Sequence, residues 1–84
     1  MKNYIITFRS VTFAQKGERI LKQGGIDCLL RRTPKVLTSK ECGYSLQVKP
    51  WEFAQALELL QVSGVQFGKA FGMDHDGRFE ELAV

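Results

Sequence analysis

The sequence predicts an α+β fold in which a four-stranded antiparallel sheet carries two helices on one face. Short β-branched and aromatic runs alternate with two segments of helical apolar spacing, and glycines and prolines separate them. The order along the chain is β-α-β-β-α-β, which is that of a split βαβ arrangement. Because such crossovers are right-handed, both helices lie on the same side of the sheet. We therefore predict a ferredoxin-like βαββαβ sandwich.

The first strand and the first helix have clear sequence signals. The run NYIITF over 3–8 is β-branched and aromatic and lies between polar residues, which predicts a buried strand. Ser10 is a suitable N-cap for a helix over 11–23, where apolar and small residues recur at helical spacing. Gly17 inside this helix costs about 1 kcal/mol relative to Ala, so we interpret it as a point of close approach to the sheet. Gly24 and Gly25 end the helix.

Two further strands are predicted on either side of a polar loop. The run IDCLLRR over 26–32 is the second strand, which Pro34 ends or confines to a sheet edge. The segment TPKVLTSKECG over 33–43 has no clear period and is predicted as a loop. The run YSLQV over 44–48 alternates and is the third strand.

The second half begins with Pro50, which suits the first position of a helix. Trp51 is predicted to be a packing residue, and the apolar face of the helix is formed by Phe53, Ala56, Leu57 and Leu60. Gly64 closes the helix, and VQFGKAF over 65–71 is the fourth strand. The DHDG segment around His75 reads as a polar turn, without the full ligand pattern of a calcium loop. We predict one domain over 1–73 and a turn and tail over 74–84.

Length and composition exclude several classes of protein. At 84 residues with 44% hydrophobic and 25% charged residues, the chain has one modest core and little room for a deep active site. Since no apolar run approaches the length of a membrane span, we expect no membrane partner. The first apolar run is also too short for a signal peptide, so we expect a cytoplasmic location.

Charge is distributed unevenly along the chain. Residues 1–49 contain ten Lys and Arg against three acidic residues, whereas residues 50–84 contain two against six. A basic half is typical of nucleic-acid binding, but it is also typical of an ordinary solvated surface. Because paired surface aromatics and a Gly-rich phosphate loop are absent from the sequence, we do not expect nucleic acid to be the principal partner.

The two cysteines differ in their predicted surroundings. Alternation in the second strand places Cys28 on the same face as two apolar residues, which predicts a buried structural thiol. Cys42 ends the 33–43 loop, and a reducing cytosol argues against a disulfide between the two. One histidine and two separated cysteines predict no zinc site and no metal.

Cys42 is the candidate nucleophile. A thiolate is the reactive form, and nearby cations favour it, whereas Glu41 opposes it. On this balance we expect the pKa of the Cys42 thiol to lie somewhat below the free value of about 8.5. Gly43 removes side-chain bulk beside the sulfur, and loop hydroxyls such as Ser39 can donate hydrogen bonds to an anion. The candidate supporting residues are Arg31, Arg32, Pro34, Ser39, Lys40 and Gly43.

The segment TPKVLTSKECGYSLQV over 33–48 resembles the signature of the selenium/sulfur (Se/S) carrier-like family of small bacterial proteins. The opening YIITFRSVTFAQKGERILKQGGI is similar as well, so the resemblance covers roughly 3–65. Cys42 and Gly43 fall on the family's Cys-Gly pair, and Pro34 and Ser39 fall on its loop positions. The chain departs from the family at Lys40 and Glu41, where small residues are more usual. The resemblance implies a carrier that holds a persulfide or selenopersulfide on Cys42.

We therefore predict a non-enzymatic carrier protein that requires no cofactor. Its partners are a donor and an acceptor of sulfur or selenium. Two alternatives stay open at this point: a small-ligand or protein-docking module without thiol chemistry, and a weak single-stranded RNA binder that uses the basic half. Salt separates the last of these, since nucleic-acid binding weakens steeply as salt rises.

Overall fold

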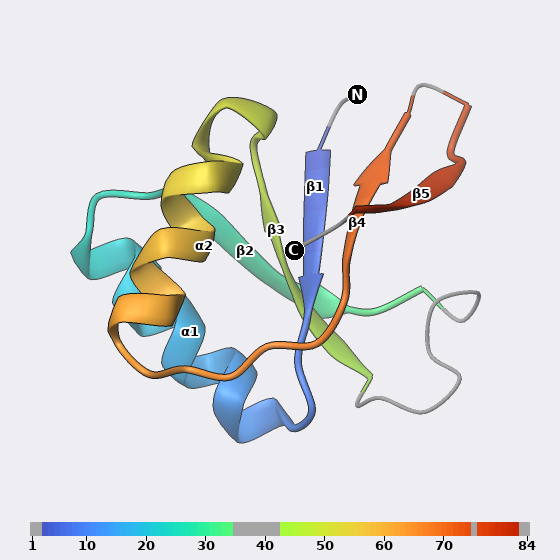
Figure 1. Cartoon of the computed structure of the whole chain (residues 1–84). Helices are drawn as coiled ribbons and strands as arrows, with labels where there is room; N and C mark the ends of the chain where they lie inside the picture. Colours follow the sequence, from blue (N-terminus) through green and yellow to red (C-terminus); the bar gives the residue numbers. More distant parts are fainter. Residues whose placement is uncertain (1–2, 35–42, 75, 83–84) are drawn as a thin grey trace.

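The computed structural model describes residues 3–34, 43–74 and 76–82. It has an α+β architecture with an antiparallel sheet and two helices, as the sequence predicts (Figure 1). The sheet has five strands in the order β2-β3-β1-β4-β5. The elements in chain order are β1 Asn3–Thr7, α1 Val11–Gln23, β2 Cys28–Arg32, β3 Tyr44–Val48, a 3₁₀ turn Pro50–Glu52, α2 Phe53–Val62, β4 Ala70–Met73 and β5 Phe79–Leu82.

β1 lies at the centre of the sheet and pairs antiparallel with both β3 and β4. Ile6 is opposite Leu46 on one side and Ala70 on the other. The connection from β1 through α1 to β2 therefore leaves β3 between the two strands. The connection from β3 through α2 to β4 leaves β1 between them in the same way. The ferredoxin-like topology inferred from the element order stays a prediction.

The predicted count of four strands is wrong, because a fifth strand follows β4. β5 falls in the segment predicted as turn and tail, and it pairs with β4 so that Met73 is opposite Phe79. Gly77 has φ of 79°, and the Asp-Gly pair that contains it is a typical hairpin turn. The strand is short and carries two glutamates, which an edge position exposed to solvent tolerates.

The core lies between the sheet and the helices. Ile6 and Phe8 from β1 and its end pack in one cluster with Leu21 of α1 and Leu60 of α2, and all four are fully buried. Because one sheet face supplies these contacts to both helices, α1 and α2 cover the same face (Figure 1). A Cβ added to Gly17 would lie 3.1 Å from Phe8 Cζ, which confirms the predicted close approach.

The helix ends follow their sequence signals. The Ser10 hydroxyl accepts a hydrogen bond from Phe13 N at 3.2 Å, so the predicted N-cap is confirmed. In the second half, Pro50 begins a 3₁₀ turn, and the α-helix itself starts at Phe53. Phe53 packs edge-on against Tyr4 with a centroid distance of 4.5 Å.

Trp51 does not pack into the core as predicted. Its side chain is 77% exposed, and the Lys49 ammonium lies 5.4 Å from the centre of its ring. The 3₁₀ turn, rather than the helix, contains Trp51, and helical spacing from the apolar face of α2 does not extend to it. The prediction of a packing role is therefore correct for Phe53 and wrong for Trp51.

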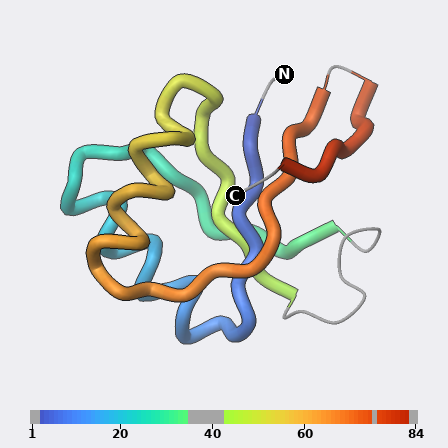
Figure 2. The backbone as a smooth tube through the Cα atoms, in the orientation of Figure 1, coloured from blue at the N-terminus to red at the C-terminus, as the bar shows by residue number. Residues whose placement is uncertain are grey.

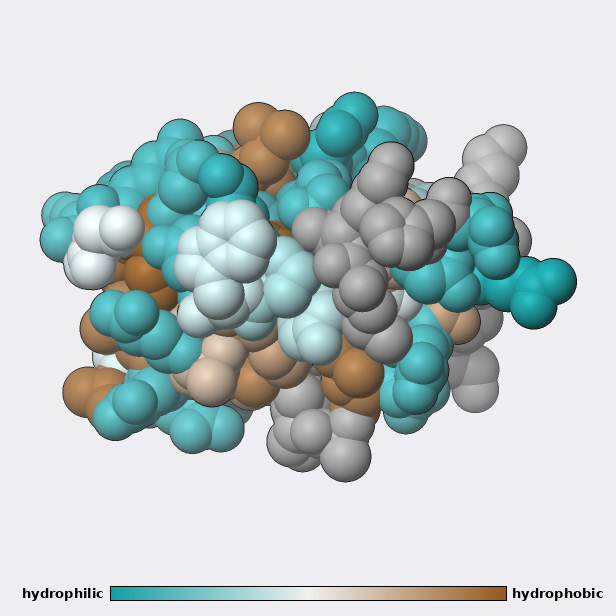
Figure 3. Space-filling view, turned by 90° about the horizontal axis from the view of Figure 1, so that it is seen from above, coloured by the Kyte–Doolittle hydropathy of each residue, from teal (hydrophilic) through white to brown (hydrophobic). Residues whose placement is uncertain are grey.

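Exposed apolar side chains are scattered over the described surface. Val11, Leu29, Trp51 and Val62 are the large ones, and they belong to different elements. Figure 3 views the end with the β3–α2 connection and the β4–β5 hairpin, and shows mostly hydrophilic residues with small apolar patches. Single exposed apolar residues are normal in soluble proteins. Apolar area alone therefore identifies no site on the described surface.

Candidate functional site

The two ends of the 33–43 loop are joined at one end of the sheet. Thr33 N donates a hydrogen bond to Gly43 O at 2.7 Å, and the β2–β3 register continues this pairing with Arg32 opposite Tyr44. The Arg32 guanidinium lies 5.7 Å from the centre of the Tyr44 ring. Figure 2 shows the chain leaving β2 and entering β3 on the same side of the molecule. We call this pair of chain ends the loop base, consisting of Arg32, Thr33, Gly43 and Tyr44.

The described residues include only part of the predicted site. Cys42, Ser39 and Lys40 lie outside them, so their roles stay predictions. Arg31 and Arg32 are exposed, and β2 ends at Arg32 on the sheet edge, which agrees with the expected effect of Pro34.

Two details of the loop base bear on its chemistry. A Cβ added to Gly43 would meet no atom within 4 Å, so the described residues leave open space beside it. The Thr33 hydroxyl is buried and has no hydrogen-bond partner. A buried hydroxyl without a partner is uncommon and costs about 1–3 kcal/mol. The loop base therefore combines free space with an unused polar group.

Beside the loop base, the sheet face opposite the helices is hollowed into a groove of about 450 Å³. Because the core takes Tyr4 and Ile6 toward the helices, alternation turns Asn3 and Ile5 to this opposite face. Both helices pack on the other side, and no helix in the described part of the chain covers the groove (Figure 1). The sheet groove is lined by Asn3, Ile5, Arg31, Arg32, Pro34, Ser45, Gln47, Met73 and Phe79.

The sheet groove was not foreseen from the sequence. It combines side chains of all five strands, and only the order of the strands brings these together. Of the predicted site residues, it contains Arg31, Arg32 and Pro34. The signal that could have revealed part of it is the alternation in NYIIT, which places Asn3 and Ile5 on one face.

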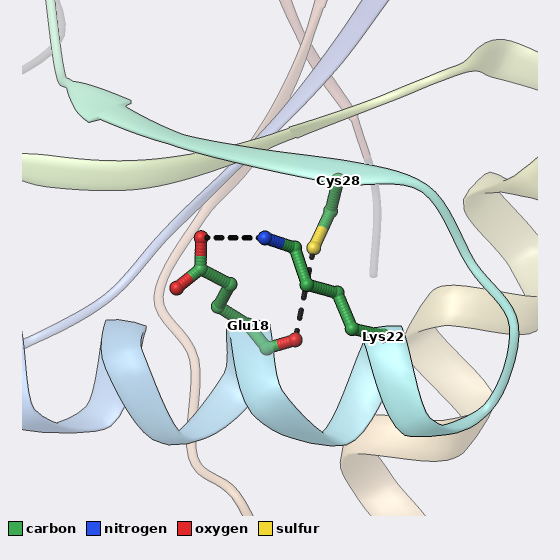
Figure 4. A network of polar contacts seen from close by, with 3 residues as sticks. All are labelled: Glu18, Lys22 and Cys28. Atoms are coloured by element: carbon green, nitrogen blue, oxygen red, sulfur yellow. Dashed lines mark hydrogen bonds and ion pairs between the residues drawn. The ribbon is translucent and has the colours of Figure 1, made fainter.

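The second thiol of the chain, Cys28, is held in an unreactive state (Figure 4). It is 6% exposed within the core cluster, and its Sγ donates a hydrogen bond to Glu18 O at 3.8 Å. Burial raises the pKa of the Cys28 thiol from 9.0 to about 11, and the Glu18 carboxylate adds to the rise while Lys22 opposes it. The Lys22 and Glu18 side chains form an ion pair at 3.4 Å. The prediction of a buried structural thiol is thus confirmed, because a thiol with this pKa stays protonated near neutral pH.

The predicted polar turn follows β4. Asp74 Oδ1 accepts hydrogen bonds from Asp76 N at 2.9 Å and from Arg78 N at 3.0 Å, so this carboxylate serves the turn. His75 lies outside the described residues. Among residues 3–34, 43–74 and 76–82, no group of three or more His, Cys, Asp or Glu side chains is placed to hold a metal ion. Over the same ranges, no helix has both the length and the apolar character needed to cross a bilayer.

Comparison with known proteins gives one match. The model of a family described as "Putative Se/S carrier protein-like" matches residues 3–71, which include both ends of the 33–43 loop and Cys42. The resemblance seen in the sequence is thereby confirmed. No curated protein and no solved structure matches the chain significantly.

Proposed function

We propose that this chain, which belongs to the Se/S carrier-like family, carries sulfur or selenium on the thiol of Cys42. The observation that supports this most is the family match over residues 3–71, which contains the Cys-Gly pair. A carrier family also indicates that the chain interacts with other proteins. We propose that these are a donor and an acceptor of sulfur or selenium.

The transfer steps need a thiolate and no cofactor. The Cys42 thiolate attacks the outer sulfur of a donor persulfide, a new S–S bond forms, and the donor's own S–S bond breaks. The donor leaves as a thiolate, and Cys42 is left as a persulfide that holds the transferred sulfur and its proton. A nucleophile of the acceptor then attacks this outer sulfur and releases the Cys42 thiolate. Selenium follows the same path as a selenopersulfide, without any net oxidation.

The state of Cys28 supports the assignment to Cys42. The chain has two cysteines, and a carrier needs an exposed thiol that ionises readily. Cys28 meets neither requirement, because it is buried and burial raises its pKa to about 11. Cys42 is therefore the thiol on which the carrier chemistry is proposed.

The loop base supports the proposal with charge. Cys42 is bonded directly to Gly43, whose carbonyl is held by Thr33 N at the end of β2. Arg31 and Arg32 belong to the same strand end, are exposed, and form no ion pair with a described carboxylate. Cations near a cysteine favour its thiolate form. The predicted contribution of Lys40 and the opposing one of Glu41 are parts of the same proposal.

A carrier thiol also indicates a compartment. Free thiols stay reduced in the cytoplasm, whereas oxidising compartments convert them to disulfides. We therefore propose a cytoplasmic carrier. The ferredoxin-like topology, the bacterial character and the non-enzymatic role predicted from the sequence are parts of this proposal.

Sulfur loading followed by intact-mass measurement tests the function. The purified protein is incubated with a low-molecular-weight alkyl persulfide, and the excess is removed before mass analysis. The wild type should gain the mass of one sulfur atom, and Cys28→Ser should gain the same. Cys42→Ser should gain none. Equal loading of Cys42→Ser and wild type would contradict the proposal and favour a docking module without thiol chemistry.

A further inference from the structure

We propose that the sheet groove binds an acidic, extended segment of the protein that exchanges sulfur or selenium with Cys42. The inference rests on the proposed carrier function for the identity of the partner, whereas the charge and shape of the groove support the class of ligand. The groove belongs to the sheet face that both helices leave uncovered in the described part of the chain.

The groove has the size of a ligand site. Its volume of about 450 Å³ falls within the range of roughly 300–1,000 Å³ that is typical of small-molecule and cofactor sites. A second hollow of about 220 Å³ shares Asn3 and Gln47 with it and includes Leu29 and Lys49. The concave surface is therefore elongated across the sheet, as an extended segment requires.

The charge of the groove favours an acidic ligand. Arg31 and Arg32 line it, and none of its described lining residues is acidic. The ion pairs of the described chain, Lys22 with Glu18 and Lys69 with Glu81, do not include either arginine. Guanidinium groups bind carboxylates through two parallel hydrogen bonds, so two such groups at one end of a groove fit an acidic side chain or chain end.

The other walls of the groove favour a polypeptide. Asn3 and Gln47 have side-chain amides that both donate and accept hydrogen bonds, which is what a peptide backbone requires. Ile5, Met73 and Phe79 add apolar surface for side chains of the segment. Asp27 of the second hollow lies in the same lining as Lys49, so this end is not strongly acidic.

Nucleic acid fits this groove less well. Single-stranded nucleic acid binds to aromatic rings on which its bases stack. The ring in the groove is Phe79, which is half-buried and lies on the edge strand, and the described central strands add no ring to the lining. A peptide therefore uses more of the lining groups than a base would.

The position of the groove connects it to the proposed chemistry. Arg32 and Pro34 border it and also flank Thr33, whose backbone holds Gly43. Gly43 is the residue bonded to Cys42. A partner segment in the groove is thereby held at the end of the sheet to which the carrier thiol is attached.

Peptide binding to charge variants tests the inference. The probe is a short fluorescein-labelled peptide in which Glu alternates with Leu, measured by fluorescence anisotropy at fixed ionic strength. Arg31→Gln and Arg32→Gln should each weaken binding about two- to fivefold, the range expected for exposed charge pairs. Gln47→Glu, which keeps both arginines but adds a like charge to the groove, should weaken binding as well. Arg19→Gln removes the same charge from an exposed position on α1 and should leave binding unchanged.

Several results would overturn the inference. Binding of a Gln-for-Leu-spaced Glu peptide is not needed, but the peptide with Gln in place of Glu should bind clearly more weakly, and equal binding would exclude charge recognition. An Arg19→Gln effect as large as that of Arg31→Gln would indicate non-specific attraction. An oligouridine strand that displaces the peptide and binds more tightly, with the same arginine dependence, would assign the groove to nucleic acid.

The carrier function is tested separately on the same proteins. Loading of Cys42 by a low-molecular-weight persulfide needs no docked partner, so the groove variants should still gain one sulfur atom. Circular dichroism spectra that match the wild type show that the variants are folded. Intact loading with lost peptide binding supports the groove, whereas intact loading with unchanged peptide binding refutes it and leaves the proposed function in place.

Discussion

Truncation of two leucines on α2 should separate a fully buried side chain from a half-buried one. Both Leu57 and Leu60 lie on the apolar face predicted for this helix, yet Leu60 is fully buried and Leu57 only half-buried. Leu60→Ala removes buried atoms and leaves a cavity, which costs about 2–5 kcal/mol. Leu57 retains contact with water, so Leu57→Ala loses less transfer free energy, and we expect its cost to be about half as large.

Urea denaturation followed by circular dichroism measures both costs. A domain of this length has an unfolding free energy of about 4–13 kcal/mol, so Leu60→Ala should lower the midpoint strongly or prevent folding. If it does not fold, Leu60→Val, which is smaller by one methylene, should fold with an intermediate cost. A cost for Leu57→Ala equal to or above that for Leu60→Ala would refute the packing described here for α2.

Three further predictions concern α1 and the thiols. Gly17→Ala should destabilise the fold by about 1–3 kcal/mol in urea denaturation, because the new methyl meets the fully buried Phe8 ring at 3.1 Å, and exposed Gln15→Ala on the same helix should be nearly neutral. The free energy of unfolding should fall as pH rises from about 9 to about 11, because the folded pKa of Cys28 is raised and its stabilising effect is complete only below the unfolded pKa. Cys28→Ala should lack that part of the pH dependence, and an identical profile would exclude Cys28 as its source. Iodoacetamide should alkylate Cys42 faster than Cys28 in the folded protein, as read by peptide mapping, and equal or reversed rates would contradict the carrier role.

Elements with signals at both ends were predicted most closely from the sequence. α1 has a capping serine at its start and a glycine pair at its end, and its bounds agree with the prediction. β3 lies between Gly43 and a proline and is likewise as predicted. In both cases the signals act locally, through capping and restricted backbone angles.

The last third of the chain was predicted less well because its structure depends on distant partners. A strand was expected over 65–71, but β4 begins only at Ala70. Val65 N instead donates to Leu60 O at the end of α2, and Gly68 N donates to Thr7 O. β5 was missed because its short acidic sequence forms a strand only beside β4.

The candidate site divides in the same way. The Cys-Gly pair is contiguous in the sequence, so the resemblance to the carrier family could be recognised there and is confirmed. The sheet groove depends on a strand order that places residues far apart in sequence side by side. Alternation predicts which way Asn3 points, but it does not predict that Gln47 and Met73 lie beside it.

Release of sulfur from the loaded protein tests the central claim most directly. Protein loaded with an alkyl persulfide and freed of excess reagent is mixed with a dithiol, and the sulfide released is measured against the loss of the added mass. The carrier account predicts one sulfide for each loaded chain, with the unmodified mass restored and the adduct mapped to Cys42 beforehand. An adduct on Cys28, or one on Cys42 that the dithiol cannot remove, would contradict it.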